Sequence, residues 1–592
     1  MQTKWILPSA LLLGAMRAAS AAQVQVVDAA GVPVPTVMLR VFPVKSPGLP
    51  NSDGGYPPSG QPFEAWKETT VFTDAQGRAT LPDDTPDFPQ QVRLRKPGYQ
   101  ELTLPLASSG SVLKIQRETD PARLAEARPA NAWLGSLDLG DPSLKLRYQT
   151  QCTFCHQQGN AFVRRERSET EWTHTIQRMM RYGSRLSTED QKILPSLLAK
   201  NWQTLREHPE RVAQTAPWQT ELATARITEW PVGDAMSQTH DVLLARDGVL
   251  YVADNIQDRL WALQPDTGRM TVYKIPHLPG DKPGGLLSAR LRDFPRHDST
   301  SNAHSLAESQ KDGHIFITPS AQQRLVEFDP HTGKFQLHEI GGGFYPHTIR
   351  VDAQDRVWFT LALSNQVGML DRATGKFKLY DLPTRSLGEK FTTHFIRQLY
   401  WLMDHGVPLA NWLKVDRDNT GVPLPYGIDI TPDGRVWFAR LHTNEIGVID
   451  PRTDRITMIP TPFKGPRRLR TDADGRLWIT AFPESAIASY DPANGKFTRY
   501  DLPVLPKGSD TPYALNVDKA RGVVWVNGDQ SDSLYALTIA TGKWVQYPLP
   551  KRVAFTRDVE IAPDGSVYTS TSSFPSWHVE DAQPTLIHLQ PR

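Results

Sequence analysis

Residues 425–462 read PYGIDITPDGRVWFARLHTNEIGVIDPRTDRITMIPTP, and this stretch decides the fold of most of the chain. It opens with P-x-x-I, passes a D-G turn into the strand-like run V-W-F, and ends with a second turn ahead of another apolar run. The same unit recurs with its central aromatic residue at Tyr251, Phe316, Trp358, Trp437, Trp478 and Trp525. A repeat of about 40 to 45 residues with four short strands predicts a β-propeller, because each blade buries its faces only against its neighbours.

A seventh unit begins at Thr556 and reaches the C-terminus after its third strand. Its fourth strand is predicted at residues 225–231, because their sequence ARITEWP is similar to KFTRYDLP and KWVQYPLP, the last strands of two other units. The start of the repeat region would then close the ring. We therefore predict a seven-bladed β-propeller over residues 217–592.

The sequence pattern of these repeats resembles the virginiamycin B lyase (streptogramin lyase) family and, more distantly, gluconolactonase-type propellers. The resemblance implies the propeller fold, and function transfers less readily than fold. In that family a catalytic histidine opens an inner strand and an acidic residue follows fourteen positions later. His240 and Asp254 keep this spacing, with aspartate in place of glutamate, so the resemblance implies His240 as a general base beside Asp254. His347 is followed at the same distance by Leu361, which departs from the pattern.

Aligning the seven units on the residue that opens each innermost strand gives one column of side chains: His240, His304, His347, Tyr426, Arg467, Tyr513 and Arg557. Innermost strands line the central channel of a propeller, so this column is expected to form a polar ring at one mouth. The three histidines are suited to one divalent metal, and the tyrosines and arginines opposite to an anionic substrate. The alternative is that the histidines hydrogen-bond buried water and neighbouring backbone.

Two insertions, at residues 276–302 and 384–425, interrupt the repeat and are expected to overhang the same mouth. The second contains a mostly apolar segment at residues 391–407 with the periodicity of a helix. Three roles are open for this segment: a lid over the pocket, a seat for the neighbouring domain, or packing against the propeller rim.

Upstream of the propeller, Cys152-Thr153-Phe154-Cys155-His156 forms the C-x-x-C-H motif at which c-type haem is attached. The thiols of Cys152 and Cys155 can form thioethers to the porphyrin, and His156 is then the proximal ligand of the iron. The chain has only these two cysteines, so no second thiol pair is available to complete a tetrahedral zinc site. We therefore expect a covalent haem c at this motif.

Two helices are predicted after the motif. Ser168 and Glu171 form a capping box, in which each side chain satisfies a backbone amide of the other residue. A second cap at Ser187 opens a helix that contains Pro195, and this proline is expected to kink or divide it.

The stretch 152–190 resembles class I c-type cytochrome domains. The resemblance implies a small all-α domain over residues 119–216, with Met179 as the distal ligand of the iron. Met180 as the ligand, or a five-coordinate iron with Met179 in the core, are the alternatives.

The first residues of the chain have the pattern of a secretory signal peptide over residues 1–22. Lys4 precedes an apolar run at residues 5–15, and small residues follow at 19–21. The mature chain is therefore expected in the periplasm. Neither this run nor any later one reaches the roughly 18 to 20 apolar residues that a membrane helix needs, so no membrane span is expected.

Residues 23–118 are expected to form a small β-sandwich, because short alternating runs are separated by turn sequences. The order of VVDAAGVPVP, FTDAQGRATLP and VRLRKPGYQELTLPL resembles the transthyretin-like regulatory domain of carboxypeptidases. The resemblance implies a supporting or binding role for this domain.

Three functions from different classes fit the sequence. The first is a periplasmic haem protein that exchanges electrons with a periplasmic partner protein. Its propeller would bind a small-molecule substrate or a partner, as in an oxidoreductase. The second is a lyase or lactonase with an accessory cytochrome domain, and the third is a binding or scaffold protein. The haem favours the first, because a redox centre serves electron flow. Nucleic acid is not expected as a ligand, because 66 basic and 64 acidic side chains leave a net charge of only +2.

Overall fold

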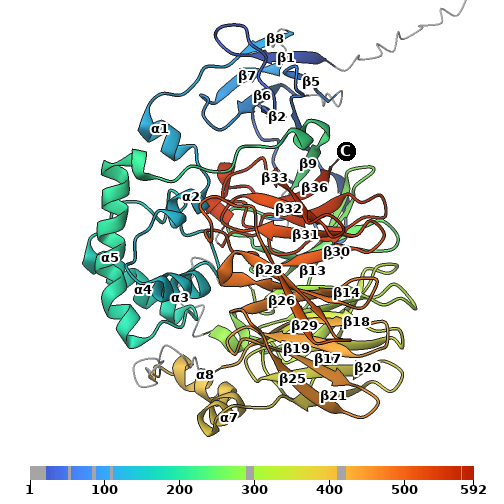
Figure 1. Ribbon diagram of the computed structural model, residues 1–592. Coiled ribbons are helices and arrows are strands. Elements are labelled where there is room, and N and C mark those ends of the chain that lie inside the picture. Colours follow the sequence, from blue (N-terminus) through green and yellow to red (C-terminus); the bar gives the residue numbers. More distant parts are fainter. Residues whose placement is uncertain are drawn as a thin grey trace, which may run out of the picture.

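The computed structural model describes most of the chain, namely residues 22–50, 55–82, 88–106, 111–288, 299–407, 409, 422–574 and 576–591. The predicted signal peptide, apart from its last residue, lies outside the described residues. Described strands far outnumber described helices, so the protein is multidomain and mainly β (Figure 1).

Seven four-stranded antiparallel sheets make up the large unit on the right of Figure 1. Six of them use consecutive strands: β10 (Thr239–Leu244), β11 (Leu250–Asp254), β12 (Arg259–Gln264) and β13 (Arg269–Lys274); β14 (Ala303–Glu308), β15 (Ile315–Pro319), β16 (Arg324–Asp329) and β17 (Lys334–Glu339); β18 (Pro346–Val351), β19 (Arg356–Leu361), β20 (Gln366–Asp371) and β21 (Lys376–Asp381); β22 (Pro425–Ile430), β23 (Val436–Arg440), β24 (Glu445–Asp450) and β25 (Arg455–Pro460); β26 (Pro466–Thr471), β27 (Leu477–Ala481), β28 (Ala486–Asp491) and β29 (Lys496–Asp501); β30 (Leu515–Asp518), β31 (Val523–Gly528), β32 (Ser533–Thr538) and β33 (Lys543–Pro548). The seventh combines β34 (Glu560–Ile561), β35 (Val567–Ser570) and β36 (Thr585–Gln590) with β9 (Arg226–Pro231).

The sheets form a ring that closes on itself, as a propeller does. Each innermost strand contacts the innermost strand of the next sheet, from β10 to β34, and β10 contacts β34 and β35 in turn. The predicted closing strand is confirmed, because β9 pairs with β36 in an antiparallel register that sets Pro231 opposite Thr585. The N-terminal strand of the repeat region therefore completes the last blade.

In two blades, the aspartate that opens the turn ahead of the second strand accepts a hydrogen bond from the tryptophan of the repeat. The indole Nε1 of Trp358 donates to Asp352 Oδ2 at 2.8 Å, and Trp478 donates to Asp472 Oδ2 at 3.0 Å. Both tryptophans are fully buried. A buried indole N–H needs an acceptor, and in these two blades the aspartate of the turn supplies it.

The N-terminal unit contains two sheets packed around Val26, Leu39 and Val92. One sheet is β1 (Gln23–Val27), β5 (Arg78–Thr80) and β8 (Val112–Lys114), and the other is β2 (Met38–Pro43), β4 (Glu68–Phe72), β6 (Gln90–Arg95) and β7 (Leu102–Pro105). The transthyretin-like assignment of this unit stays a prediction.

Two strands of the N-terminal unit extend blades of the propeller. Strand β4 pairs with β9, so its sheet continues into the seventh blade, and β3 (Pro62–Glu64) pairs with β13 at the outer edge of the first. At the first junction the buried guanidinium of Arg40 bonds Glu68 Oε2 at 2.6 Å. Glu68 belongs to the same unit as Arg40, and the contact that crosses to the propeller is the one from Arg40 Nη2 to Asp581 Oδ2 at 2.9 Å. The unit is therefore joined to the propeller through backbone pairing and this ion pair.

Five helices lie between the N-terminal unit and the propeller in the chain: α1 (Pro121–Glu126), α2 (Ala130–Gly135), α3 (Pro142–Cys152), α4 (Glu169–Arg181) and α5 (Thr188–Glu207). They share a core that includes Trp133, Tyr148 and Trp202, and we call residues 121–207 the helical unit. The predicted capping box of Ser168 and Glu171 is present at the start of α4. Whether this unit is a cytochrome domain stays a prediction.

Helix α5 runs through Pro195 without being divided, which corrects one of the outcomes expected for this residue. Leu194, Leu198 and Trp202 on either side are buried in the core of the helical unit. Their packing holds the helix together although the proline removes one backbone hydrogen bond.

The second insertion lies on the same side of the propeller as the helical unit (Figure 1), and the described part of the first insertion contacts it. The first contributes the short helix η4 (Gly285–Leu287), and the second contributes α7 (Leu387–His394) and α8 (Ile396–Asp404). Leu287 and Ile396 pack into one apolar cluster with Tyr426 and Tyr513 of the predicted ring, so the described parts of both insertions lie over the mouth.

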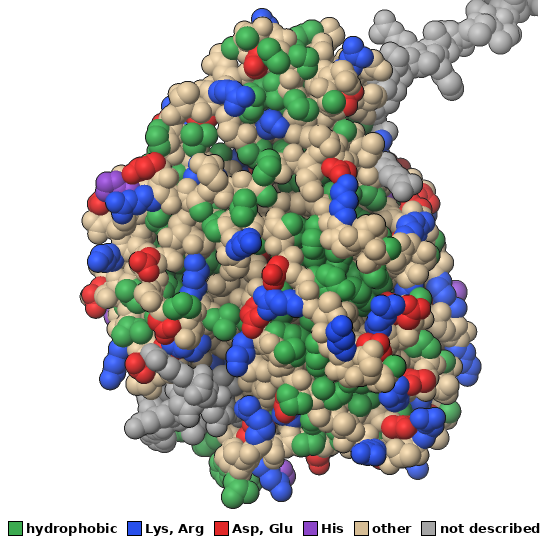
Figure 2. Space-filling view, viewed as in Figure 1, with side chains coloured by type: hydrophobic (Ala, Val, Ile, Leu, Met, Phe, Trp, Pro, Cys, Tyr) green, Lys and Arg blue, Asp and Glu red, His purple; other side chains and the backbone are tan. Residues whose placement is uncertain are grey.

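The remaining short helices are η2 (Pro209–Arg211), η3 (Thr220–Thr224), η5 (Phe482–Glu484), η6 (Ser576–His578) and η7 (Glu580–Ala582). Acidic and basic side chains alternate over the face seen in Figure 2. Among the described residues, none of the helices has the length and apolar character to cross a membrane.

Candidate functional site

Each residue of the predicted ring lies at an irregular start of an innermost strand. In β10, β14, β18, β22 and β26 the ring residue is the second of the strand, and the pairing register shifts directly after the first. Such bulges redirect side chains and are common beside functional sites. Tyr513 and Arg557 precede β30 and β34 on the other two blades.

The imidazole rings of the three histidines lie close together at tilted angles. The ring centroids of His240 and His304 lie 3.6 Å apart, and those of His304 and His347 lie 4.1 Å apart. All three side chains are buried. Burial lowers the pKa of each imidazole, in His240 to about 3, so all three are neutral at pH 7.

The other half of the ring combines tyrosines with arginines. The hydroxyl groups of Tyr426 and Tyr513 form a short hydrogen bond, Arg467 Nη2 donates to the Tyr426 hydroxyl at 3.0 Å, and Arg557 Nη1 donates to the Tyr513 hydroxyl at 3.1 Å. Although burial opposes ionisation, Arg467 and Arg557 lower the pKa of the Tyr513 phenol. This half therefore carries two arginine cations beside a tyrosine whose pKa they lower.

The two halves meet on both sides. The ring centroids of His347 and Tyr426 lie 3.8 Å apart, and the Tyr513 hydroxyl lies 3.4 Å from Nε2 of His240. The structure thus brings all seven residues of the aligned column together at one mouth. Beside them is a small cavity of about 50 Å³, lined in part by His240, His304 and Arg557.

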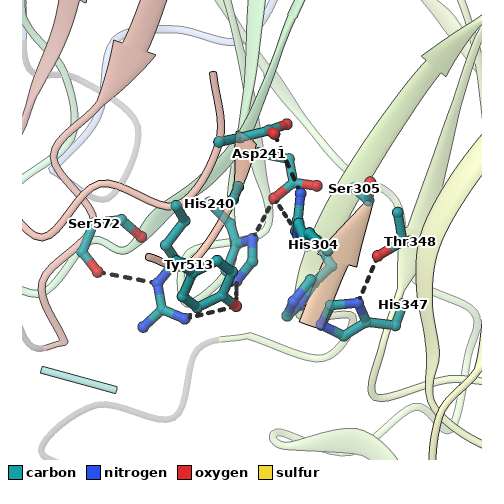
Figure 3. Close-up of polar contacts among 12 residues, drawn as sticks. His240, Asp241, His304, Ser305, His347, Thr348, Tyr513 and Ser572 are labelled. Carbon is teal, nitrogen blue, oxygen red and sulfur yellow. Dashed lines mark hydrogen bonds and ion pairs between the residues drawn. The ribbon is translucent and has the colours of Figure 1, made fainter. Parts of the chain in front are cut away.

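A second set of polar residues lies directly behind the ring, and the sequence analysis missed it. Asp241 Oδ1 lies 2.8 Å from His240 Nδ1 and 2.6 Å from Nη2 of Arg468, and Arg468 also faces Asp558 at 3.3 Å (Figure 3). Although burial acts in the opposite direction, Arg468 keeps the pKa of Asp241 well below its usual value. Each of these residues follows a ring residue by one position, so the same alignment read one residue further on would have found them.

Asp254, the predicted partner of His240, lies at the end of β11 with hydrogen bonds to backbone. Its Oδ1 accepts from the amides of Gln238 at 3.1 Å and Ile256 at 3.3 Å. Burial raises the pKa of Asp254 to about 6. The carboxylate that hydrogen-bonds His240 is Asp241, so a catalytic role for Asp254 stays a prediction.

The predicted metal of the histidine ring has little support in this arrangement. The planes of neighbouring imidazoles are inclined by 40° and 53°, and those of His240 and His347 by 89°. Within the described ranges, no three or more His, Cys, Asp and Glu side chains are grouped so that they could hold a metal ion. The Nε2 atoms of His304 and His347 are nevertheless buried without a hydrogen-bond partner among those residues. A bound water or ligand would supply the missing hydrogen bonds.

The C-x-x-C-H segment covers the ring. Phe154 and Cys155 line the same small cavity as His240 and His304. The guanidinium of Arg467 lies 4.0 Å from the centre of the Phe154 ring, and Arg557 Nη2 donates to the carbonyl oxygen of Cys155 at 3.0 Å. The predicted haem motif and the predicted ring are therefore in direct contact.

Further hydrogen bonds hold the segment in place. Gln157 Nε2 donates to the carbonyl of Asp529 at 2.7 Å and to Asp532 Oδ1 at 2.6 Å, and the amide of Gln158 donates to Gln530 Oε1 at 2.9 Å. Gln157 and Gln158 are buried, so these bonds are shielded from water.

The residues predicted to hold the haem lie at the boundary between the helical unit and the propeller. Cys152 ends α3 and packs against the helical core, where burial raises its thiol pKa to about 12. Neither cysteine forms a disulfide. His156 Nδ1 lies 3.1 Å from the carbonyl oxygen of Gln157, which leaves Nε2 free of that bond.

The two candidate methionines lie on α4. Met179 is half-buried. Met180 packs against the core of the helical unit, and its sulfur accepts a hydrogen bond from the amide of Leu186 at 3.4 Å. The distal role of Met179 stays a prediction.

The fold and the ring place this chain among β-propeller proteins with a polar site at the channel mouth. A family model for the virginiamycin B lyase family matches residues 413–574. The virginiamycin B lyase of Nocardia farcinica (strain IFM 10152) is 26% identical over 239 residues, which are 39% of this chain and 79% of that protein. The propeller is therefore similar to virginiamycin B lyases in sequence.

Solved structures of lyases are also similar to this chain. A streptogramin B lyase structure shares 17% identity with a TM-score of 0.46, covering 62% of this chain and 98% of the lyase. Virginiamycin B lyase from Staphylococcus aureus, in its selenomethionine form, shares 16% identity with a TM-score of 0.45, covering 62% of this chain and 99% of the lyase.

Proposed function

We propose that this chain is a periplasmic c-type haem protein in which the polar ring of a lyase-like propeller binds a small ligand beside the haem. The observation that supports it most is the position of Cys155. Cys155 lines the same cavity as His240, and the carbonyl oxygen of Cys155 accepts a hydrogen bond from Arg557 of the ring. A ligand in the ring would lie within contact of the haem-binding segment, as electron transfer over a short distance needs.

The residues present fit a covalent haem. Cys152 and Cys155 are both free thiols, and burial keeps the first protonated and unreactive toward solvent. The carbonyl of Gln157 accepts the Nδ1 proton of His156, and a histidine that ligates a metal usually donates its other ring N–H in this way. When bound, a haem here would supply one-electron chemistry, with His156 as its proximal ligand.

The ring indicates which ligand the propeller would take. Arg467 and Arg557 are buried cations, Tyr513 is a phenol whose pKa these arginines lower, and the histidines are neutral hydrogen-bond donors or acceptors. Such a set suits a small anion or an oxygen-rich molecule. A cavity of about 50 Å³ holds only a few non-hydrogen atoms, so a larger substrate would have to displace Phe154 or the insertions.

Purification of the full chain from a host that matures c-type cytochromes tests this function. The haem should survive acid-acetone extraction in the wild type and be lost in Cys152→Ala, whose side chain lies away from the ring. Candidate oxidisable anions are then added to the oxidised protein, and reduction of the haem is followed by absorption. A protein without covalent haem would overturn the proposal.

A second candidate function is lyase chemistry in the propeller, with the cytochrome as an accessory. The sequence similarity to virginiamycin B lyases favours it more directly than it favours electron transfer. Asp241 accepts the Nδ1 proton of neutral His240, so Nε2 is left as a base facing Tyr513. A pKa of about 3 makes His240 a weak base, and Tyr513 is the alternative proton carrier.

Three variants separate the candidates. If a lyase substrate is turned over by Cys152→Ala without haem, the redox function is wrong for that reaction. Asp254→Asn then tests the family pattern, and Asp241→Asn tests the pair seen in the structure. If Asp241→Asn loses turnover and Asp254→Asn keeps it, Asp241 is the carboxylate that acts with His240.

A further inference from the structure

His578 stands beside the haem motif although it belongs to the propeller. It ends the short helix η6, in the connection between β35 and β36 of the seventh blade. The segment is anchored on both sides. The hydroxyl of Ser576 donates to the carbonyl of Ser237, and the carboxylate of Glu580 bonds Arg95 at 2.8 Å. The segment that carries His578 is therefore anchored to the propeller on one side and to the N-terminal unit on the other.

The imidazole of His578 has no hydrogen-bonding function within the described part of the chain. Both ring nitrogens are shielded from solvent, and neither has a partner there. The ring packs 4.4 Å from the centroid of Phe162 and 4.2 Å from that of Trp577. An apolar ring would fill this space without the cost of two unpaired nitrogens, so the imidazole points to a ligand that is bound through nitrogen.

The neighbouring ring is that of His156. The centroids of His156 and His578 lie 5.7 Å apart, with an angle of 82° between the ring planes. Bonds from a metal to imidazole nitrogen are about 2.0 to 2.1 Å, as for zinc, so two imidazoles on opposite sides of one metal have centroids roughly 6 Å apart. The observed separation agrees with that requirement.

The methionines are less suited to the same position. The sulfur of Met180 is already used by the amide of Leu186 and by packing in the helical core. Met179 is one residue away on the same helix, and its side chain is partly exposed. His578, by contrast, is held by another unit and has nitrogens without partners.

We propose that His578 is the second axial ligand of the iron, opposite His156, in a bis-histidine haem held jointly by the helical unit and the seventh blade. The inference rests on the proposed covalent haem. His578 follows Thr571 and Ser572 in the same connection of the seventh blade. The carbonyl oxygen of Ser572 accepts a hydrogen bond from Arg557 of the ring at 3.3 Å, so this connection would link the iron to the ring. Ligand binding in the ring and the potential of the haem would then affect one another.

Absorption and electron paramagnetic resonance spectra of the full-length holoprotein test the inference. The oxidised wild type should be low-spin and should lack the red charge-transfer band that a methionine–iron bond gives. His578→Gly should become high-spin, and added imidazole should restore the low-spin spectrum. His578→Met should gain the charge-transfer band and a higher reduction potential, because a methionine ligand raises the potential.

Controls separate this inference from the proposed function. Met179→Ala and Trp577→Phe should leave the spectrum unchanged. A charge-transfer band in the wild type that disappears in Met179→Ala, with no change in His578→Gly, would overturn the inference while leaving the haem protein in place. A chain without covalent haem would overturn the proposed function and the inference with it.

Discussion

Asp241 Oδ1 lies 2.8 Å from Nδ1 of His240, and the same oxygen lies 2.6 Å from Nη2 of Arg468 on the far side of the channel (Figure 3). Asp241 and Arg468 are 227 residues apart in the sequence, so this one carboxylate links the first blade to the fifth. It also fixes which nitrogen of His240 carries the proton. The ring is therefore supported from behind by a buried ion pair.

Asp241→Asn should destabilise the protein by about 3 to 5 kcal/mol at pH 7, because it leaves the Arg468 cation without its closest charge partner. The folded pKa of Asp241 is held below the ordinary value of 3.8. Its stabilising contribution is therefore complete above pH 4 and is lost as the pH falls further. The thermal midpoint of the wild type should fall below pH 4 more steeply than that of the variant.

The exposed Asp266 provides a matched control. Asp266→Asn should change the thermal midpoint little at any pH, because the side chain lies in a surface turn. Equal midpoints for Asp241→Asn and Asp266→Asn at pH 7 would show that the buried pair contributes no net stability.

Much of the propeller could be predicted because one sequence unit recurs in every blade. Seven units with the same turn and aromatic residue locate the inner strands, and the ring residues follow from aligning them. Asp241 and Arg468 were missed because their pairing crosses the channel and joins distant units. Local patterns give the position of such residues but not their partner.

Contacts between the units could not be predicted for a similar reason. Nothing in C-x-x-C-H indicates that Phe154 lies on Arg467, and nothing in the strand at residues 68–72 indicates that it pairs with β9. Both depend on the surfaces of two separately folded parts. His578 also gave no signal, because it is a single histidine outside the aligned column.

Asp254→Asn should change the pH dependence of stability in the direction opposite to Asp241→Asn. Burial raises the folded pKa of Asp254 from 3.8 to about 6. A raised pKa contributes stability that is present below the unfolded value and is lost as the pH rises through 6, by roughly 3 kcal/mol for two units. Asparagine keeps an oxygen for the amides of Gln238 and Ile256 and has no proton to lose.

Thermal midpoints at pH 4, 5, 6 and 8 measure this effect. The variant should gain on the wild type between pH 4 and 8, and most of the gain should come between pH 4 and 6. Parallel curves for the two proteins would mean that Asp254 is not protonated in the folded state near pH 5.

Arg40→Met should destabilise the junction between the N-terminal unit and the seventh blade. Arg40 is buried against Glu68, and Glu229 and Lys551 lie close enough to influence the same charges. Removing one partner of a buried pair costs about 3 to 5 kcal/mol, because the other charge is left uncompensated. The double variant Arg40→Met with Glu68→Gln should recover part of the loss in a denaturant titration. A double variant less stable than Arg40→Met would show that Glu68 is stabilised by another group.

Phe154→Ala should release the C-x-x-C-H segment from the propeller mouth. Phe154 contributes its ring to Arg467 and an edge contact to Tyr426 at 5.9 Å, and such cation–π and aromatic contacts are together worth about 1 to 3 kcal/mol. The remaining anchors at Gln157 and Gln158 should keep the helical unit attached. Hydrogen exchange of the backbone amides at residues 152–158 should therefore become faster by about one to two orders of magnitude, which corresponds to the free energy lost.

The half-buried Phe497 on β29, far from the mouth, is the matched control, and Phe497→Ala should leave exchange in this segment unchanged. The same exchange rate in Phe154→Ala as in the wild type would show that Phe154 does not hold the segment on the ring, and the contact between haem motif and propeller would then depend on the hydrogen bonds of Arg557 and Gln157.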